Sequence, residues 1–99
     1  MGDIQLDVAM ARLLESLQTI QTSDEMEAFL HDILTPHEIK ELAQRLEVAS
    51  LLNQGMPYVR VSRTTGASST TVSRVSKCLN GEVGGYRLVL GRLAQVHVQ

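Results

Sequence analysis

The segment Pro57–Leu79 contains two short helical patterns separated by Gly66. The second pattern places Val72, Val75 and Leu79 on one face and coats the other face with small hydroxyl residues and two cations. Gly66 suits a turn with positive φ, where a Cβ atom would be strained. A helix, a glycine-bearing turn and an amphipathic second helix are typical of a helix-turn-helix, whose second helix enters the DNA major groove. The sequence therefore predicts a helix-turn-helix over residues 57–79.

The polar residues of this segment are the predicted DNA contacts. Short hydroxyl side chains near a helix start allow close approach to base edges, and we expect this role for Ser69, Thr70 and Ser73. Neighbouring cations and hydroxyls are expected to contact the phosphates. The predicted DNA-binding set comprises Arg60, Arg63, Ser68, Ser69, Thr70, Thr71, Ser73, Arg74 and Lys77.

Helix capping is the alternative interpretation of the hydroxyl residues at positions 68–71. Serine and threonine accept hydrogen bonds from the first backbone amides of a helix, so Ser68 or Ser69 is expected to be the N-cap. Such a run alone more often reflects capping than DNA readout. The glycine turn, the amphipathic second helix and the local positive charge together favour the DNA interpretation. Arg74 has two open interpretations, a DNA contact or a cap on a neighbouring helix.

Charge is divided unevenly along the 99 residues. The formal net charge is −2, but residues 1–47 hold ten acidic residues against three Lys or Arg, whereas residues 48–99 hold one acidic residue against six Lys or Arg. The predicted DNA-binding segment lies in the basic half, and local charge matters more for phosphate attraction than the total does. An ordinary solvated surface with uneven charge is the alternative.

Apolar residues repeat at intervals of three and four throughout, which predicts an all-α chain. We expect six helices in a single domain over residues 1–99, with dimerisation helices in 1–55, the helix-turn-helix in 57–79 and a C-terminal helix in 83–97. The first helix is expected at about 4–21, with an apolar stripe that includes Leu6, Met10, Leu13 and Leu17, and the second at about 23–32.

Two capping boxes mark helix starts. Thr22 is followed by Glu25 and Thr35 by Glu38, and Pro36 occupies the first turn of the long helix that Thr35 begins. That helix is expected to end at Gly55 and to form the spine of the domain.

Composition predicts a small aliphatic core. The chain is 43% hydrophobic, with no Trp, one Phe and two Tyr. A domain of this size gains stability from a partner subunit, so we expect a homodimer.

The single cysteine, Cys78, excludes a disulfide framework and suits a reducing cytosol. Its place beside Leu79 predicts a small buried thiol. Neither a secretory leader nor a long apolar run is recognisable, so a cytoplasmic location is expected.

Catalytic and metal-binding patterns are not recognisable. His31, His37 and His97 lack the paired spacing of a helical metal site. The glycine-rich segment 80–85 lacks the Lys and Ser or Thr of a phosphate loop and follows no strand. We therefore expect no enzyme activity. A helical protein-interaction module remains the alternative to a DNA-binding regulator, since a fold alone does not fix a function.

Two segments carry a family resemblance. LTPHEIKELAQRLEVASLLNQG and TGASSTTVSRVSKCL, followed by GGYR at 84–87, resemble the Trp-repressor-like superfamily, and within it the YerC/YecD group of Trp-repressor-related proteins. The resemblance covers about residues 34–93. It implies a six-helix Trp-repressor-like fold, an intertwined homodimer, and two recognition helices that address half-sites of double-stranded DNA about one helical turn apart. Trp repressor is itself one of the proteins that define this docking geometry.

The resemblance also implies a ligand site. Trp repressor holds tryptophan between two arginines, which correspond here to Arg45 and Arg74, and Thr35 corresponds to a residue near the polar end of the ligand. The chain departs from that pattern at Val75, where the repressor has glycine. The isopropyl group of Val75 is expected to occupy space that the indole needs. Arg45 has an alternative role in pairing with Glu41 or with a carboxylate of a partner chain.

Overall fold

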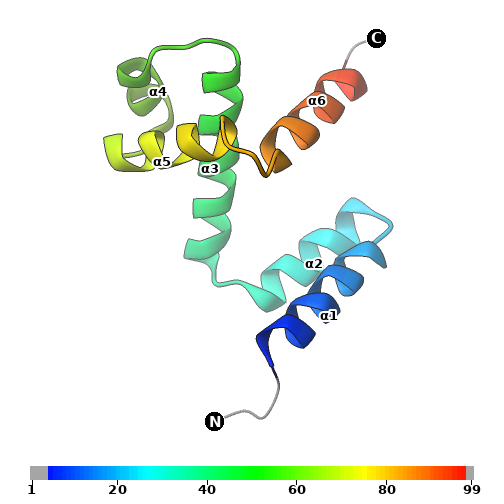
Figure 1. Cartoon of the computed structure of the whole chain (residues 1–99). Helices are drawn as coiled ribbons and strands as arrows, with labels where there is room; N and C mark the ends of the chain where they lie inside the picture. Colours follow the sequence, from blue (N-terminus) through cyan, green and yellow to red (C-terminus); the bar gives the residue numbers. More distant parts are fainter. Residues whose placement is uncertain (1–4, 98–99) are drawn as a thin grey trace. The chain divides into compact units, whose positions relative to one another are not determined.

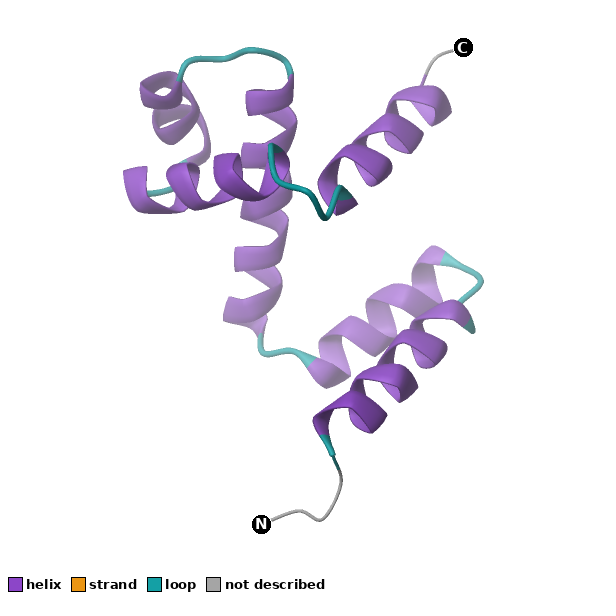
Figure 2. Cartoon of the chain, viewed as in Figure 1, coloured by secondary structure: helices purple, strands orange, loops and turns teal. Residues whose placement is uncertain are grey.

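The computed structural model describes residues 5–97, which form six helices joined by short loops (Figures 1 and 2). The helices are α1 (Leu6–Gln18), α2 (Ser23–Ile33), α3 (Pro36–Asn53), α4 (Tyr58–Thr65), α5 (Ser69–Leu79) and α6 (Gly85–His97). Residues 5–97 contain no strand, so the predicted all-α class is confirmed. The predicted start of the first helix at Ile4 lies outside the described residues, and α1 ends three residues before the predicted Gln21.

The chain divides into two compact units, one ending at Ile39 and the other beginning at Lys40. The first unit contains α1, α2 and the first turn of α3. The second contains the rest of α3 together with α4, α5 and α6. The predicted helix-turn-helix lies entirely within the second unit.

Of the two predicted capping boxes, the one at Thr35 is complete, and the one at Thr22 is partial because its glutamate bonds the residue before the N-cap. The Glu25 N–H donates to Thr22 Oγ1 at 3.1 Å, and Glu25 Oε1 accepts from the Gln21 N–H at 2.9 Å. At the start of α3 the bonds are reciprocal, since the Glu38 N–H donates to Thr35 Oγ1 at 3.1 Å and Glu38 Oε1 accepts from the Thr35 N–H at 2.8 Å. Each box satisfies amides that a helix start leaves without intrahelical partners.

The α3 capping box makes a pH-dependent contribution to stability. The hydrogen bond from the Thr35 backbone, followed by that from its side chain, lowers the pKa of the Glu38 carboxyl below its ordinary value of 4.5. A carboxyl with a lower pKa in the folded state stabilises that state above the unfolded pKa, and the contribution is lost as the pH falls through the folded pKa.

We therefore expect Glu38→Gln to reduce stability at neutral pH, because the helix N-terminus favours a negative charge. The difference from wild type should shrink as the pH falls from 7 towards 3, because the Glu38 carboxyl becomes protonated as the pH passes through its folded-state pKa. Urea unfolding of wild type and variant at pH 7 and pH 3 measures the difference in free energy of unfolding. An equal difference at both pH values would show that the charge of Glu38 does not contribute to stability.

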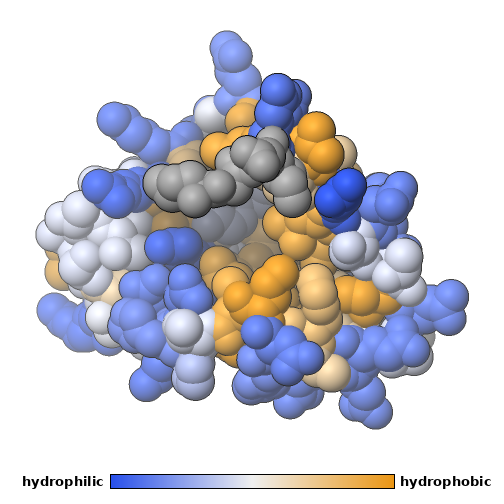
Figure 3. All heavy atoms as spheres, turned by 90° about the horizontal axis from the view of Figure 1, so that it is seen from below, coloured by the Kyte–Doolittle hydropathy of each residue, from blue (hydrophilic) through white to orange (hydrophobic). Residues whose placement is uncertain are grey.

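The apolar stripe of α1 is partly exposed in the single chain. Leu6 is 85% exposed and Met10 55%, whereas Leu13 and Leu17 are half-buried, and within the described residues neither α1 nor α2 contains a fully buried side chain. Figure 3 shows apolar side chains at the surface of the face that it presents. The three-and-four periodicity correctly predicted a helix with an apolar face. A repeat of this kind identifies the apolar side of a helix and not what covers it.

The second unit has a compact aliphatic core. α4 packs against α5, and α5 packs against α6 (Figure 1). The buried residues come from all four helices and the α4–α5 turn: Val48, Ala49, Val61, Ala67, Val72, Val75, Leu79 and Leu90. Fully burying a Val or Leu side chain contributes about 1.5–3 kcal/mol. The predicted inward face of the second helix of the helix-turn-helix is thus confirmed.

The turn between α4 and α5 has the predicted geometry. Gly66 adopts the left-handed conformation with φ 76°, and its N–H donates to the Ser62 carbonyl at 2.9 Å. An added Cβ atom would meet nothing within 4 Å, so the requirement for glycine here is conformational rather than steric.

We expect Gly66→Ala to reduce the free energy of unfolding by about 1–2 kcal/mol, the cost of placing a Cβ-bearing residue in the left-handed region. Gly66→Asn is the matched control, because asparagine tolerates this region better and should lose less. Urea denaturation measures both. Equal losses in the two variants would contradict a conformational origin.

Candidate nucleic-acid interface

The start of α5 is capped by Ser68. The Thr71 N–H donates to Ser68 Oγ at 3.1 Å, and the two side-chain hydroxyls are also 3.1 Å apart. Of the two predicted caps, Ser68 is therefore the one used. The cap uses the hydroxyl groups of Ser68 and Thr71, so capping explains part of the hydroxyl run at 68–71.

One side of α5 forms a concave surface, here called the polar depression. Its volume is about 670 Å³, and it is lined by Tyr58, Ser69, Thr70, Ser73, Arg74, Ser76, Lys77 and Asn80. Five of these residues belong to the predicted DNA-binding set. None of these described lining residues carries a carboxylate, whereas two carry a positive charge. Such a surface suits an anion with many acceptor oxygens.

The remaining predicted DNA contacts lie elsewhere in the second unit. Arg60 and Arg63 are exposed on α4, and Ser68 is exposed at the start of α5. Thr71 is half-buried and lines a different cavity. The structure therefore gathers Ser69, Thr70, Ser73, Arg74 and Lys77 on one surface, and the other four predicted residues are not part of its lining.

Three residues of the polar depression were missed in the sequence. Ser76 and Asn80 continue the spacing of three and four from Ser69 and Ser73, so helical periodicity could have identified them. Tyr58 comes from the first turn of α4, and no local pattern connects it to α5. Its hydroxyl forms a hydrogen bond with Ser76 Oγ, a contact between residues eighteen positions apart.

A second cavity, here called the arginine cavity, lies on another side of α5. Its volume is about 320 Å³, and Arg45, Thr71, Arg74, Val75, Cys78 and Tyr86 line it. The two arginines thus share one cavity, and Arg74 also lines the polar depression. Val75 is only 3% exposed and belongs to the core. Arg45 Nη2 lies 3.8 Å from Glu41 Oε2, which confirms the predicted pairing, and the half-exposed pair contributes little to stability.

Thr35 belongs to the first unit, whereas both arginines belong to the second. Its hydroxyl oxygen accepts a hydrogen bond from the Glu38 backbone N–H in the capping box. The structure therefore gives Thr35 a role in starting α3, and its predicted ligand contact stays a prediction.

The end of α5 is held by Arg87 of α6. Arg87 Nη1 donates to the Leu79 carbonyl, and Nη2 donates to the Gly81 carbonyl at 2.8 Å. Carbonyls at a helix end have no intrahelical partner, and a cation there is also favoured by the helix dipole. The GGYR segment therefore fixes the C-terminal end of α5 against the start of α6.

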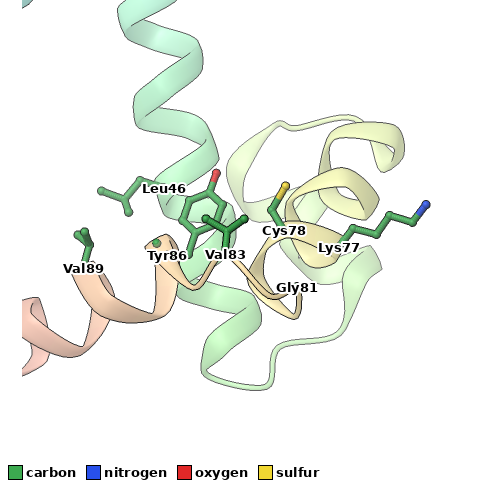
Figure 4. A pocket seen from close by; sticks show the side chains of 8 residues that line it. Leu46, Lys77, Cys78, Gly81, Val83, Tyr86 and Val89 are labelled. Atoms are coloured by element: carbon green, nitrogen blue, oxygen red, sulfur yellow. The ribbon is translucent and has the colours of Figure 1, made fainter. Parts of the chain in front are cut away.

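An apolar groove of about 720 Å³ adjoins this junction (Figure 4). It is lined by Leu46, Lys77, Cys78, Gly81, Val83, Gly85, Tyr86 and Val89. Cys78 is exposed here, so the prediction of a buried thiol is wrong. The buried face of α5 passes through Val75 and Leu79, and one residue corresponds to about 100° of rotation around a helix. Cys78 therefore lies beside the core face rather than on it.

Residues 5–97 contain neither a metal-binding cluster nor a membrane-spanning helix. No group of three or more His, Cys, Asp or Glu side chains in this range is arranged to hold a metal ion. Among the helices of the same range, none has both the length and the apolarity to cross a bilayer.

Comparison with known proteins gives consistent matches over most of the chain. Residues 9–94 match the family described as "Trp repressor protein". The uncharacterised protein YerC of Bacillus subtilis (strain 168) is 38% identical over 88 residues, which span 89% of this chain and 85% of that protein.

Two solved structures have the same fold. A TrpR-like protein from Eubacterium eligens ATCC 27750 superposes with a TM-score of 0.81 at 38% identity, covering 87% of this chain and 89% of the other. A candidate Trp repressor from Staphylococcus aureus superposes with a TM-score of 0.83 at 31% identity, covering 93% and 96% of the two chains.

Proposed function

The chain belongs to the Trp repressor family, a family of DNA-binding regulators rather than enzymes, and we propose that it is a sequence-specific, repressor-like transcriptional regulator that binds DNA as a homodimer. The observation that supports this most directly is the polar depression on α5, with its two cations, its hydroxyl residues and no carboxylate among its described lining residues. The proposed mechanism uses α4 and α5 as the helix-turn-helix, with α5 as the recognition helix.

In this mechanism the two kinds of polar residue have different roles. Ser69, Thr70 and Ser73 face base edges in the major groove, where short hydroxyls read donors, acceptors and thymine methyl groups. Arg60 and Arg63 of α4 contact phosphates on either side and set the orientation of α5. Each phosphate neutralised by a cation releases counterions, which makes binding depend steeply on salt.

Exposed apolar side chains support the homodimer. Leu6, Met10 and Leu14 of α1 are more than half exposed, and Leu88 and Val89 of α6 are also exposed. Soluble monomers rarely leave extended apolar surface uncovered. In the proposed dimer the partner covers these faces, and the two α5 helices then address two half-sites related by two-fold symmetry.

Selection of bound sequences from random duplex DNA tests the proposal. The expected result is enrichment of a two-fold symmetric site, because a symmetric dimer presents two identical recognition helices. Enrichment of a single unsymmetric half-site would contradict the dimeric mode of binding. A failure to enrich any sequence would contradict sequence-specific binding altogether.

A regulator gated by a small ligand is the second candidate, and the arginine cavity supports it. Arg45 and Arg74 line the same cavity, and Arg74 also lines the polar depression. A ligand that engages Arg74 in the cavity would change the position of a side chain used at the DNA surface. Val75 limits the room for an indole ring, because its side chain lies in the lining.

Calorimetric titration with L-tryptophan tests this second candidate. A saturable isotherm that is weakened by Arg45→Gln would support ligand gating, because the arginine is expected to contact the ligand directly. If wild type gives no binding heat at millimolar tryptophan while Val75→Gly does, Val75 closes the site to indole. Absence of heat with both proteins would contradict tryptophan as the effector.

A further inference from the structure

We propose that the polar depression holds one phosphodiester of the DNA backbone, and that Tyr58, Ser76 and Asn80 belong to this phosphate seat together with Arg74 and Lys77. The inference rests on the proposed function, since it assumes that α5 faces DNA. It goes further by assigning one phosphate to one surface and by adding three residues that lie outside the predicted DNA-binding set.

The floor of the depression is a stripe along α5. Ser69, Ser73, Ser76 and Asn80 follow one another at intervals of four, three and four, so they share one face of the helix. Lys77 lies beside this stripe, and its side chain extends away from Val83 and Tyr86 of the apolar groove in Figure 4. The ammonium group of Lys77 therefore lies at the edge of the polar depression and does not point into the apolar groove.

Hydrogen bonds connect Tyr58 of α4 with Ser76 and Asn80 of α5. Asn80 Nδ2 donates to the Ser76 carbonyl at 2.9 Å and lies 3.4 Å from Ser76 Oγ, and Ser76 Oγ is bonded to the Tyr58 hydroxyl. Ser76 is only 7% exposed, whereas Tyr58 is 50% exposed. The buried serine thus fixes the position of a hydroxyl group that reaches solvent.

In the hydrogen bond between Tyr58 and Ser76 either hydroxyl can donate. When the Ser76 hydroxyl donates to Tyr58 Oη, the Tyr58 O–H can point to an acceptor outside the chain. A donor that is already held in place loses little side-chain entropy on binding. Tyr58 is therefore suited to donate to an oxygen atom in the depression.

The chemistry of the lining favours a phosphate oxygen as that acceptor. Arg74 and Lys77 supply positive charge, and Tyr58 supplies a neutral donor. No carboxylate among the described lining residues would repel an anion. Hydrogen bonds between cations and phosphate oxygens are about twice as strong as neutral ones, and protein donors of all these types contact DNA backbones.

Methylphosphonate scanning tests the phosphate seat. The probe is the duplex selected by the wild-type protein, with one backbone phosphate at a time replaced by an uncharged methylphosphonate. We expect one position in each half-site at which this replacement lowers wild-type affinity about tenfold or more, as for loss of a charge-assisted hydrogen bond. Lys77→Gln and Tyr58→Phe should each bind the unmodified duplex more weakly and lose part of their sensitivity at that same position, because each removes one of the groups that hold the phosphate.

Arg92→Gln is the matched control, because it removes one exposed cation from α6, outside the lining of the depression. It should retain the wild-type sensitivity at every position. Lys77→Gln should also lower the salt slope, by less than the value of about 0.9 for a whole phosphate contact because Arg74 remains at the same phosphate, while Tyr58→Phe leaves the slope unchanged because a phenol carries no charge.

The outcomes separate this inference from the proposed function. If wild type binds the selected duplex but Lys77→Gln and Tyr58→Phe keep full sensitivity at every phosphate, the phosphate seat is wrong and the proposed function stands. If Tyr58→Phe lowers only the melting temperature and keeps the sensitivity, Tyr58 is structural and its place in the seat is wrong. If wild type binds no duplex, the proposed function itself fails.

Discussion

Replacement of both Thr70 and Ser73 with Asp is expected to abolish binding to the selected duplex. Both residues are exposed and line the polar depression, so the variant places two carboxylates where the proposed complex has DNA. Like charges brought together at an interface cost several kcal/mol, which corresponds to a loss of about a thousandfold or more in affinity. Fluorescence anisotropy with labelled duplex measures the loss.

The folded dimer should survive this double substitution. Thr70 lies in the first turn of α5, where a negative charge is favoured by the helix dipole, and Ser73 is exposed. Arg92→Glu is the control, because it changes the net charge by the same two units on α6. Unchanged DNA binding by the double variant, or an equal loss in Arg92→Glu, would show that α5 is not the recognition surface.

Replacement of Met10 and Leu14 with Glu is expected to dissociate the dimer and thereby to weaken DNA binding. Both side chains are more than half exposed in the single chain, so a monomer would tolerate the two charges. In the proposed dimer they lie against the partner, where each apolar side chain contributes about 1.5–3 kcal/mol and an unpaired charge is strongly disfavoured. Sedimentation at micromolar concentration measures the oligomeric state.

Arg12→Glu provides the matched control for this second prediction. It alters the net charge by the same two units on α1, and helical geometry places it away from the Met10 and Leu14 side of the helix. The control should remain dimeric. A wild-type protein that sediments as a stable folded monomer, or a double variant that remains dimeric, would contradict the proposed dimer.

Local sequence signals predicted most of the fold. Hydroxyl and glutamate spacing indicated the starts of α2 and α3, and Gly66 indicated the left-handed turn before α5. The repeat through Val72 and Val75 identified the buried side of α5. These features depend on residues within a turn or two of one another, so periodicity and capping chemistry are sufficient to identify them.

The features that the sequence did not predict depend on contacts between distant residues. Tyr58 joins the polar depression because α4 packs against α5, and no pattern within α4 indicates this. Cys78 was expected to be buried beside Leu79 but lies one residue off the core face. The stripe on α1 shows that Met10 lies on an apolar side, and it does not identify the surface that covers this side.

A titration of the selected duplex at increasing salt tests the central claim most directly. We expect two chains to bind each duplex and the logarithm of the association constant to fall linearly with the logarithm of salt concentration. In each half-site Arg60 and Arg63 contact one phosphate each, and Arg74 and Lys77 share a third, so six contacts at about 0.9 each give a slope of about −5. A slope near zero, or no binding at low salt, would contradict a DNA-binding function for this chain.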